Sequence, residues 1–173
     1  MRSLLLMTIL LHWYAFSQTM ETFDDYIGLE KVFKDYIKAI DSKNMDTIVK
    51  FFDHTDCTFH FGENKPIVIN SKEELFNLFS TWINSPKSLF VSTKLEELNV
   101  VPVWDDVNTK LCTVDATYSR IGNGGIVLGR GRSLYHFYRE EHVYPHRLLK
   151  KWKEWKLYMI SDLAIEDGAE LSD

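Results

Sequence analysis

The stretch YIKAIDSKNMDTIVKFFDHTDCTFHFG, residues 36–62, decides the fold of this chain. It contains the end of one helix, a short second helix and then an alternating pattern that predicts a strand. Cys57, Phe59 and Phe61 fall on one face of that strand, and Thr58 and His60 fall on the other. The hydrophobic period changes at residues 53–56, so the chain passes there from helices into a sheet.

The residues on the N-terminal side of this change predict two helices. Asp24 or Asp25 can cap the first helix, in which apolar residues recur at steps of three and four. These apolar residues are Tyr26, Leu29, Phe33, Tyr36, Ile37 and Ile40. Turn-favouring residues 41–44 interrupt the pattern, and residues 45–52 predict a second amphipathic helix. Both helices have an apolar face that must be buried.

A small hairpin and a third helix are expected next. Turn residues 62–66 separate the aromatic strand from a short returning strand at residues 67–69. Ser71 and Glu74 form a capping box, which predicts a helix that starts at Lys72. This helix should end near Asn84, because Pro86 can neither donate a backbone hydrogen bond nor fit a continuing helix.

The remainder of the chain predicts four long strands, at residues 89–104, 107–121, 126–140 and 152–165. Turn signals at residues 105–106 and in the glycine cluster 122–125 indicate antiparallel neighbours. The predicted fold class is therefore α+β, with a curved antiparallel sheet wrapped around three N-terminal helices.

Length and composition are those of one domain, because 173 residues with 45% hydrophobic side chains suffice for a packed core. Arg2 precedes an apolar run at residues 4–16, and small residues stand one and three positions before Gln18. This pattern predicts a signal peptide at residues 1–17, a domain at residues 18–165 and an acidic flexible tail at residues 166–173.

A membrane anchor is the alternative for the N-terminal run, but about 13 apolar residues fall short of the ~20 that a spanning helix needs. We therefore expect a secreted or periplasmic protein with no membrane span after cleavage. The net charge of −5 argues against nucleic acid as a partner.

Cys57 and Cys112 each lie within an apolar, strand-like run. Two buried thiols are expected, and a single intrachain disulfide is the alternative. The sequence has no CxxC spacing, and nothing near His142 and His146 supplies the further ligands that a metal needs. We expect no metal and no cofactor.

The order of these features resembles the nuclear transport factor 2-like superfamily, also called SnoaL-like. The resemblance rests on the 36–40 helix, the break at 41–44, the Phe51-Phe52 pair and the acidic residues before the aromatic strand. Gly129-Arg130-Gly131 and Trp155-Lys156-Leu157 extend it, so that it covers residues 24–165. It implies a cone-shaped sheet with a pocket at its open end, and often a homodimer. Family members include enzymes as well as non-catalytic binding modules.

Two residues are candidates for proton transfer. Asp115 interrupts a strand that is otherwise apolar or hydroxylated, and a buried carboxylate requires compensation. His60 stands near the end of the first strand, where the resemblance implies an aspartate base in isomerase-like members. As alternatives, Asp115 pairs with Arg130 or Arg132 of the next strand or faces water, and His60 faces solvent.

Five further residues are candidates for ligand binding: Trp82, Tyr118, Arg132, His136 and Tyr158. The aromatic residues suit a flat hydrophobic ligand, and an arginine suits a carboxylate. Packing in the core or in a dimer surface is the alternative for the aromatic residues. The sequence thus predicts a binding module for a small hydrophobic or carboxylate-bearing ligand, or else a cofactor-independent lyase, isomerase or hydrolase.

Overall fold

A computed structural model describes residues 28–62, 64–85, 88–105, 109–142 and 151–166 of the protein. The predicted signal peptide, the capping residues Asp24 and Asp25, Pro86 and residues 167–173 of the predicted tail lie outside these ranges. The loop that contains His146 also lies outside them, so the predictions made for these segments stay predictions.

The N-terminal helix spans residues 28–42 and ends where Lys43 adopts a left-handed backbone conformation with φ of 53°. Helix α2 (Met45–Ile48) is capped by Asn44 and continues as the 3-10 helix η1 (Val49–Phe51). The second predicted helix is therefore shorter as an α-helix than expected. Helix α3 (Lys72–Ile83) has the predicted capping box, in which the Glu74 amide donates to Ser71 Oγ at 3.1 Å.

Within the described ranges, seven strands form one sheet, in the order β2-β1-β7-β5-β4-β3, with β6 paired to β5. They are β1 (Cys57–His60), β2 (Ile67–Ile69), β3 (Ser92–Asp105), β4 (Thr109–Ile121), β5 (Val127–His142), β6 (Lys151–Trp152) and β7 (Lys156–Glu166). The α+β class and the antiparallel meander are confirmed. One pairing differs, because β1 lies parallel to β7, and the predicted strand 152–165 is split between β6 and β7.

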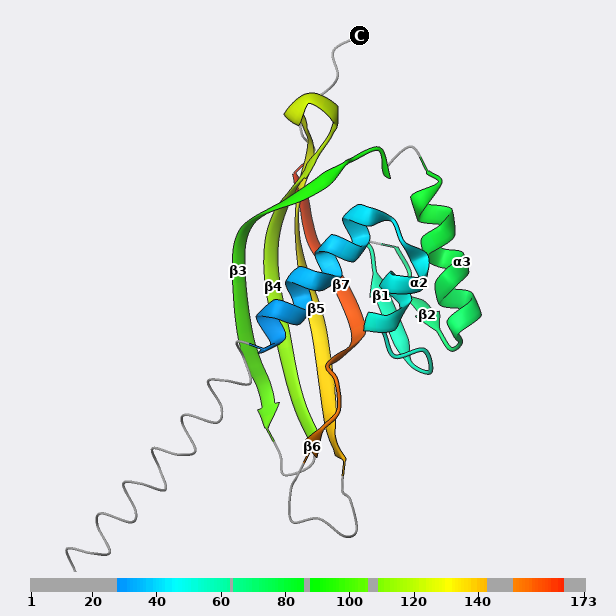
Figure 1. Ribbon diagram of the computed structural model, residues 1–173, viewed down its shortest axis with the longest axis vertical. Helices are drawn as coiled ribbons and strands as arrows, with labels where there is room; N and C mark the ends of the chain where they lie inside the picture. The colour runs from blue at the N-terminus through cyan, green and yellow to red at the C-terminus, as the bar shows by residue number, and fades with distance from the viewer. Residues whose placement is uncertain (1–27, 63, 86–87, 106–108, 143–150, 167–173) are drawn as a thin grey trace, which may run out of the picture.

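The N-terminal helix, α2 and α3 lie on one face of the curved sheet, which we call the inner face (Figure 1). The N-terminal helix crosses β3, β4 and β5 diagonally, and α3 lies beside β1 and β2. The core fills the space between these layers. The ring centres of Phe33 and of Tyr135 on β5 are 4.8 Å apart, and those of Phe59 on β1 and Phe79 on α3 are 6.0 Å apart. Cys57 and Cys112 are both buried on the inner face, and no disulfide joins them.

Candidate functional site

Asp115 and Arg132 lie on the outer face of the sheet, away from the helices. The Arg132 Nε and Nη2 atoms donate to the two carboxylate oxygens of Asp115, at 3.0 and 2.7 Å. This two-bond pair lowers the pKa of Asp115, chiefly through the hydrogen bonds from Arg132. Of the alternatives that the strand pattern left open, the structure shows the cross-strand pairing.

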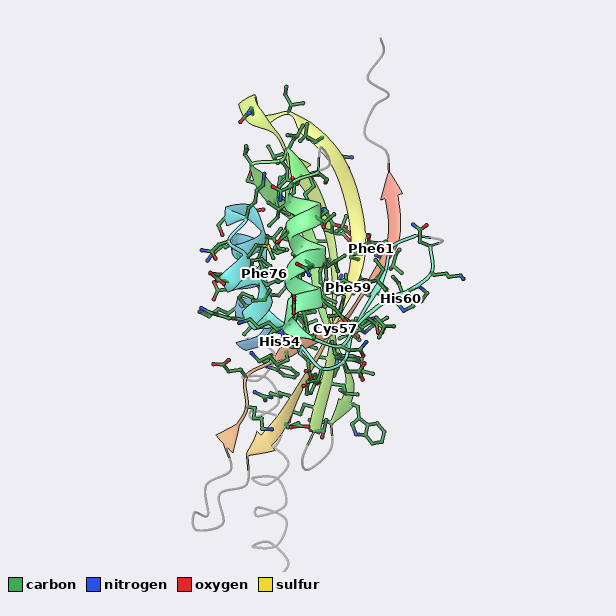
Figure 2. All side chains as sticks on the ribbon, turned by 90° about the vertical axis from the view of Figure 1, so that its right-hand side faces the viewer. His54, Cys57, Phe59, His60, Phe61 and Phe76 are labelled. Carbon is green, nitrogen blue, oxygen red and sulfur yellow. The ribbon has the colours of Figure 1, made fainter. Side chains whose placement is uncertain are left out.

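His60, His136 and Tyr158 also lie on the outer face. His136 Nδ1 is 2.9 Å from Thr113 Oγ1, and its ring is 6.1 Å from that of Tyr158. Burial lowers the pKa of His136, and the neighbouring His60 adds to the effect. Figure 2 shows His60 on the side of β1 away from the helices, whereas Phe59 points toward α3. The outer face thus collects five of the seven predicted residues.

Trp82 and Tyr118 are the two predicted residues on the helix side of the sheet. Trp82 of α3 packs its ring 5.6 Å from that of Phe90, in the segment that leads into β3. Tyr118 lies directly across from Gly131 of β5, where a Cβ would approach the tyrosine Cζ to 3.0 Å. The missing side chain at position 131 therefore makes room for the Tyr118 ring against the sheet.

A chain of polar groups extends from Tyr118 across the inner face. The Tyr118 hydroxyl is 3.2 Å from Ser133 Oγ, and Ser133 Oγ donates to Asp162 Oδ1 at 2.6 Å. Ser133 is 1% exposed, and its neighbour Ala116 is fully buried. This hydroxyl–carboxyl chain links β4, β5 and β7 within a surface that is mainly apolar and aromatic.

Asp162 faces inward because of a bulge in β7. Leu157 pairs with Phe137, but Met159 pairs with His136, so Tyr158 is an extra residue in β7. The extra residue reverses the alternation, which places Ile160 and then Asp162 on the inner face, with Asp162 directly opposite Ser133. A regular strand beginning at Leu157 would have placed Asp162 outside, so sequence alternation could not find it.

The inner face changes the acidity of its ionisable groups. Burial raises the pKa of Asp162, and the hydrogen bond from Ser133 and the charge of Arg120 counteract only part of this effect. Burial also raises the pKa of Tyr36 and of Tyr135. Asp162 is thus a half-buried carboxyl group that holds its proton more tightly than an exposed one does.

Arg120 lies two residues beyond Tyr118 on β4 and shares its face. Its guanidinium carbon lies over two rings, at 4.4 Å from the centre of the Phe90 ring and 4.7 Å from that of Tyr118. One of its nitrogens donates to Thr93 Oγ1. The spacing of Tyr118 and Arg120 was a signal that the sequence offered, because residues two apart share a strand face.

Asp41, near the end of the N-terminal helix, binds the Thr93 side chain that accepts the hydrogen bond from Arg120. Thr93 donates to its carboxylate twice, from the backbone amide at 3.0 Å and from Oγ1 at 2.6 Å. Both oxygens of Asp41 therefore have a partner at the end of the N-terminal helix. The role of Asp41 is to hold Thr93, which in turn accepts the hydrogen bond from Arg120.

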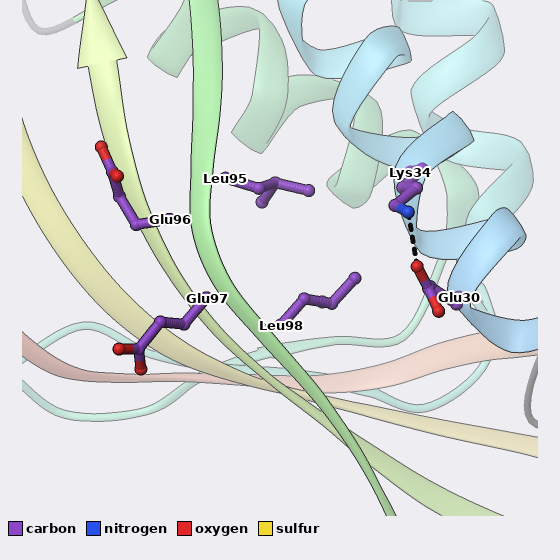
Figure 3. A pocket seen from close by; sticks show the side chains of 6 residues that line it. All are labelled: Glu30, Lys34, Leu95, Glu96, Glu97 and Leu98. Carbon is purple, nitrogen blue, oxygen red and sulfur yellow. Dashed lines mark hydrogen bonds and ion pairs between the residues drawn. The ribbon is translucent and has the colours of Figure 1, made fainter.

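A separate groove of about 230 Å³ lies between the N-terminal helix and β3. Leu95 and Leu98 point toward the helix, whereas the carboxylates of Glu96 and Glu97 point the other way (Figure 3). On the helix side, Lys34 is already bonded to Glu30. The groove is smaller than typical ligand pockets of roughly 300–1,000 Å³ and offers a ligand no unpaired charge on its inner side.

The described ranges contain no cluster of three or more histidine, cysteine or acidic residues that could hold a metal ion. Within the same ranges, no helix combines the length and the apolar character needed to cross a membrane.

Comparisons with solved structures show which known proteins share this architecture. The hexachlorocyclohexane dehydrochlorinase LinA-type3 from Novosphingobium barchaimii superposes with a TM-score of 0.56 at 9% identity, over 88% of this chain and 96% of the dehydrochlorinase. A "putative dehydratase" of the nuclear transport factor 2-like family from Streptomyces avermitilis superposes with a TM-score of 0.52 at 12% identity, over 83% of this chain and 97% of the dehydratase. The chain has the nuclear transport factor 2-like fold.

The nuclear transport factor 2-like fold also includes proteins without an assigned role. A protein of unknown function with a cystatin-like fold from Nostoc punctiforme superposes with a TM-score of 0.51 at 10% identity, over 79% of this chain and 87% of that one. No family model matches the sequence, and no curated protein matches it. Identities near 10% establish the fold alone, so function has to be argued from the site.

Proposed function

We propose that the chain is a small-molecule-binding domain that takes its ligand on the inner face, beside Tyr118, Ser133 and Asp162. The observation that carries this proposal is the polar chain itself. Ser133 donates to Asp162 at 2.6 Å within a surface lined by aromatic rings. Few polar groups in an apolar surface are the pattern of small-molecule sites, where they orient the ligand. Trp82 and Phe90 supply flat apolar surface for its body.

A cofactor-independent enzyme is the second candidate, and the raised pKa of Asp162 favours it. A carboxyl group whose pKa is raised by burial can act as a general acid or base closer to neutral pH. The structural neighbours include a dehydrochlorinase and a "putative dehydratase". On this hypothesis Asp162 moves the proton in an elimination or isomerisation, and Arg120 or Tyr118 stabilises the developing oxyanion. Asp162 then replaces Asp115 and His60, which lie on the other face.

Binding is tested with N-phenyl-1-naphthylamine, an uncharged aromatic dye that fluoresces in apolar sites. The matched variants are Trp82→Ala, on the helix side, and Trp104→Ala, on β3 with a side chain 60% exposed. We expect Trp82→Ala to weaken dye binding at least fivefold and Trp104→Ala to change it less than twofold. Trp82→Phe, monitored by thermal melting, covers the case in which the alanine variant unfolds. Undetectable binding to the wild type, or loss only in Trp104→Ala, would overturn the proposal.

We also propose a homodimer that covers the outer face. Val101 and Leu163 are about half exposed there, at 48% and 50%, and apolar surface of this kind favours a partner. Sedimentation equilibrium of Val101→Lys and of Leu163→Glu tests the idea: both variants should shift the protein toward monomer. If the wild-type protein stays monomeric at 50 times the concentration used in the dye-binding assay, the homodimer is excluded.

Secretion is likewise a proposal, supported by the sequence pattern of residues 1–17. Mass spectrometry of the protein from its expressing host should give a chain that begins at Gln18. An intact N-terminus on the functional protein would contradict cleavage after Ser17.

A further inference from the structure

Arg120 is the positively charged side chain that stacks on the rings of the proposed binding site. The guanidinium carbon lies over both the Phe90 and the Tyr118 ring, at 4.4 and 4.7 Å from their centres. Stacking of this kind fixes the plane of the guanidinium and leaves its edge, with the N–H donors, directed along that plane. Thr93 Oγ1 accepts from one nitrogen, which sets the direction of the edge.

Arg120 differs from Arg132 in how its charge is balanced. Arg132 on the outer face forms two hydrogen bonds to Asp115, whereas no carboxylate among the described residues forms an ion pair with Arg120. Asp162 is close enough for Arg120 to influence its pKa, but the hydrogen bond that Asp162 accepts comes from Ser133. A half-buried guanidinium therefore keeps donors for a group that the described residues do not supply.

A second positively charged side chain lies over the Phe90 ring. Lys43 Nζ lies 5.3 Å from the centre of the Phe90 ring and donates to the Ser88 carbonyl. The aspartate at this end of the N-terminal helix, Asp41, has both oxygens bonded to Thr93. The surroundings of Phe90 are therefore more favourable to a negative charge than the net charge of the chain would suggest.

We propose that the ligand of the inner face is an aromatic or similarly planar molecule with an anionic group, and that Arg120 binds that anionic group. The proposal rests on the proposed function, since it names the ligand class for the same site. A planar oxyanion such as a carboxylate accepts two parallel hydrogen bonds from a guanidinium edge. The aromatic body then lies against Phe90 and Trp82, whose rings are 5.6 Å apart.

Asp162 gives the same site a dependence on pH. The groups that face it are Arg120 and Tyr118 of β4, Tyr135 of β5 and Tyr36 of the N-terminal helix, with Ser133 as its hydrogen-bond donor. Of these side chains, Asp162 is the one that gains a negative charge as the pH rises through the acid range. An anionic ligand should therefore bind more weakly above the pKa of Asp162 than below it, because the carboxylate repels it.

Two dyes that differ by one sulfonate test the proposal. These are 1-anilinonaphthalene-8-sulfonate, which is anionic at every pH used, and N-phenyl-1-naphthylamine, which has the same rings without the sulfonate. Arg120→Met should weaken binding of the sulfonate dye at least tenfold and that of the neutral dye less than threefold. Arg120→Lys should recover part of the loss. Arg132→Met, which removes an arginine from the outer face, should change neither affinity more than twofold.

The outcomes separate this inference from the proposed function. If Arg120→Met leaves the sulfonate dye unaffected, or weakens both dyes equally, the anion site is wrong, even when Trp82→Ala still shows binding at the inner face. If neither dye binds the wild type, both proposals fail. Repeating the sulfonate titration between pH 4 and 8 on Asp162→Asn adds a second readout. The loss of affinity with rising pH should disappear in that variant, and its persistence would exclude Asp162 as the source.

Discussion

Asp115 and Asp162 lie on opposite faces of the same sheet, and their carboxyl pKa values shift in opposite directions. Asp115 receives two hydrogen bonds from Arg132 on the outer face, which lower its pKa. Asp162 receives one from Ser133 on the inner face, where burial outweighs it and raises the pKa. Each aspartate has an apolar residue before it or after it in a strand of the same sheet, so the face on which it lies decides its chemistry.

The two aspartates should respond oppositely to replacement by asparagine. Because folding raises the pKa of Asp162, this group contributes stability that is fully present below the pKa of the carboxyl group in the unfolded chain, about 4. The contribution is lost as the pH rises through the pKa that Asp162 has in the folded protein. At pH 7 the ionised Asp162 therefore destabilises the folded protein, and Asp162→Asn should raise Tm by about 2 °C. Asp115 has a lowered pKa, so its contribution is present at pH 7, and Asp115→Asn should cost about 1 kcal/mol or less.

Thermal melts between pH 3 and 8 check this pair of variants. The gain from Asp162→Asn should shrink below pH 4, where the wild-type carboxyl group is protonated. The cost of Asp115→Asn should shrink as the pH falls through the folded pKa of Asp115. Parallel pH profiles for the two variants would show that the two carboxyl groups do not differ as described.

The sequence predicted the architecture because the signals for it are local. The period change at residues 53–56, the capping box at Ser71 and the glycine turn at residues 122–125 each act within a few residues. The start of β1 at Cys57 and of α3 at Lys72 were predicted correctly. The parallel pairing of β1 with β7 could not be read in this way, because it joins strands that are far apart in the chain.

The candidate site was harder to predict, because it depends on which face each strand residue occupies. The predicted set included Tyr118 and Trp82 but omitted Ser133 and Asp162. The extra residue Tyr158 in β7 reverses the alternation before Asp162, and nothing in the local sequence marks that bulge. A deciding feature of the site is thus a register shift between two strands, which is set by tertiary packing.

Removal of the Ser133 hydroxyl should raise the pKa of Asp162 further. The hydrogen bond from Ser133 is the largest influence that lowers this pKa, and Ser133→Ala deletes it without adding volume to the buried site. Carboxyl carbon chemical shifts of Asp162, followed by NMR across the acid range, measure the change. Ser119→Ala is the control, since Ser119 donates to Glu96 and does not contact Asp162. An unchanged or lower pKa in Ser133→Ala would contradict the polar chain.

The buried thiols should be unreactive in the folded protein. Burial raises the pKa of Cys57 to about 12, so the thiolate that attacks disulfide reagents is scarce at pH 8. Cys112 is 2% exposed. We expect Ellman's reagent to titrate neither thiol in the native protein and both after unfolding in guanidinium chloride. Rapid titration of the native protein, or no titration after unfolding because the two form a disulfide, would contradict the buried-thiol arrangement.

Thr93 should matter to both stability and ligand binding, because it stands between Asp41 and Arg120. Its Oγ1 donates to Asp41 at 2.6 Å and accepts from Arg120. Thr93→Val keeps the shape of the side chain but removes both bonds, which should cost about 1–3 kcal/mol of the free energy of unfolding. The guanidinium loses the contact that directs its edge, so the sulfonate dye should bind more weakly than to the wild type.

Urea unfolding and dye titration measure the two effects of Thr93→Val separately. Thr117→Val is the matched control, because Thr117 lies on the outer face of β4, opposite Arg132. It should change stability by less than about 0.5 kcal/mol, as is usual for surface substitutions, and leave dye binding unaltered. If Thr93→Val is destabilised yet binds the sulfonate dye as tightly as the wild type does, Thr93 supports the helix end through Asp41 alone. The direction of Arg120 would then come from its contacts with the Phe90 and Tyr118 rings.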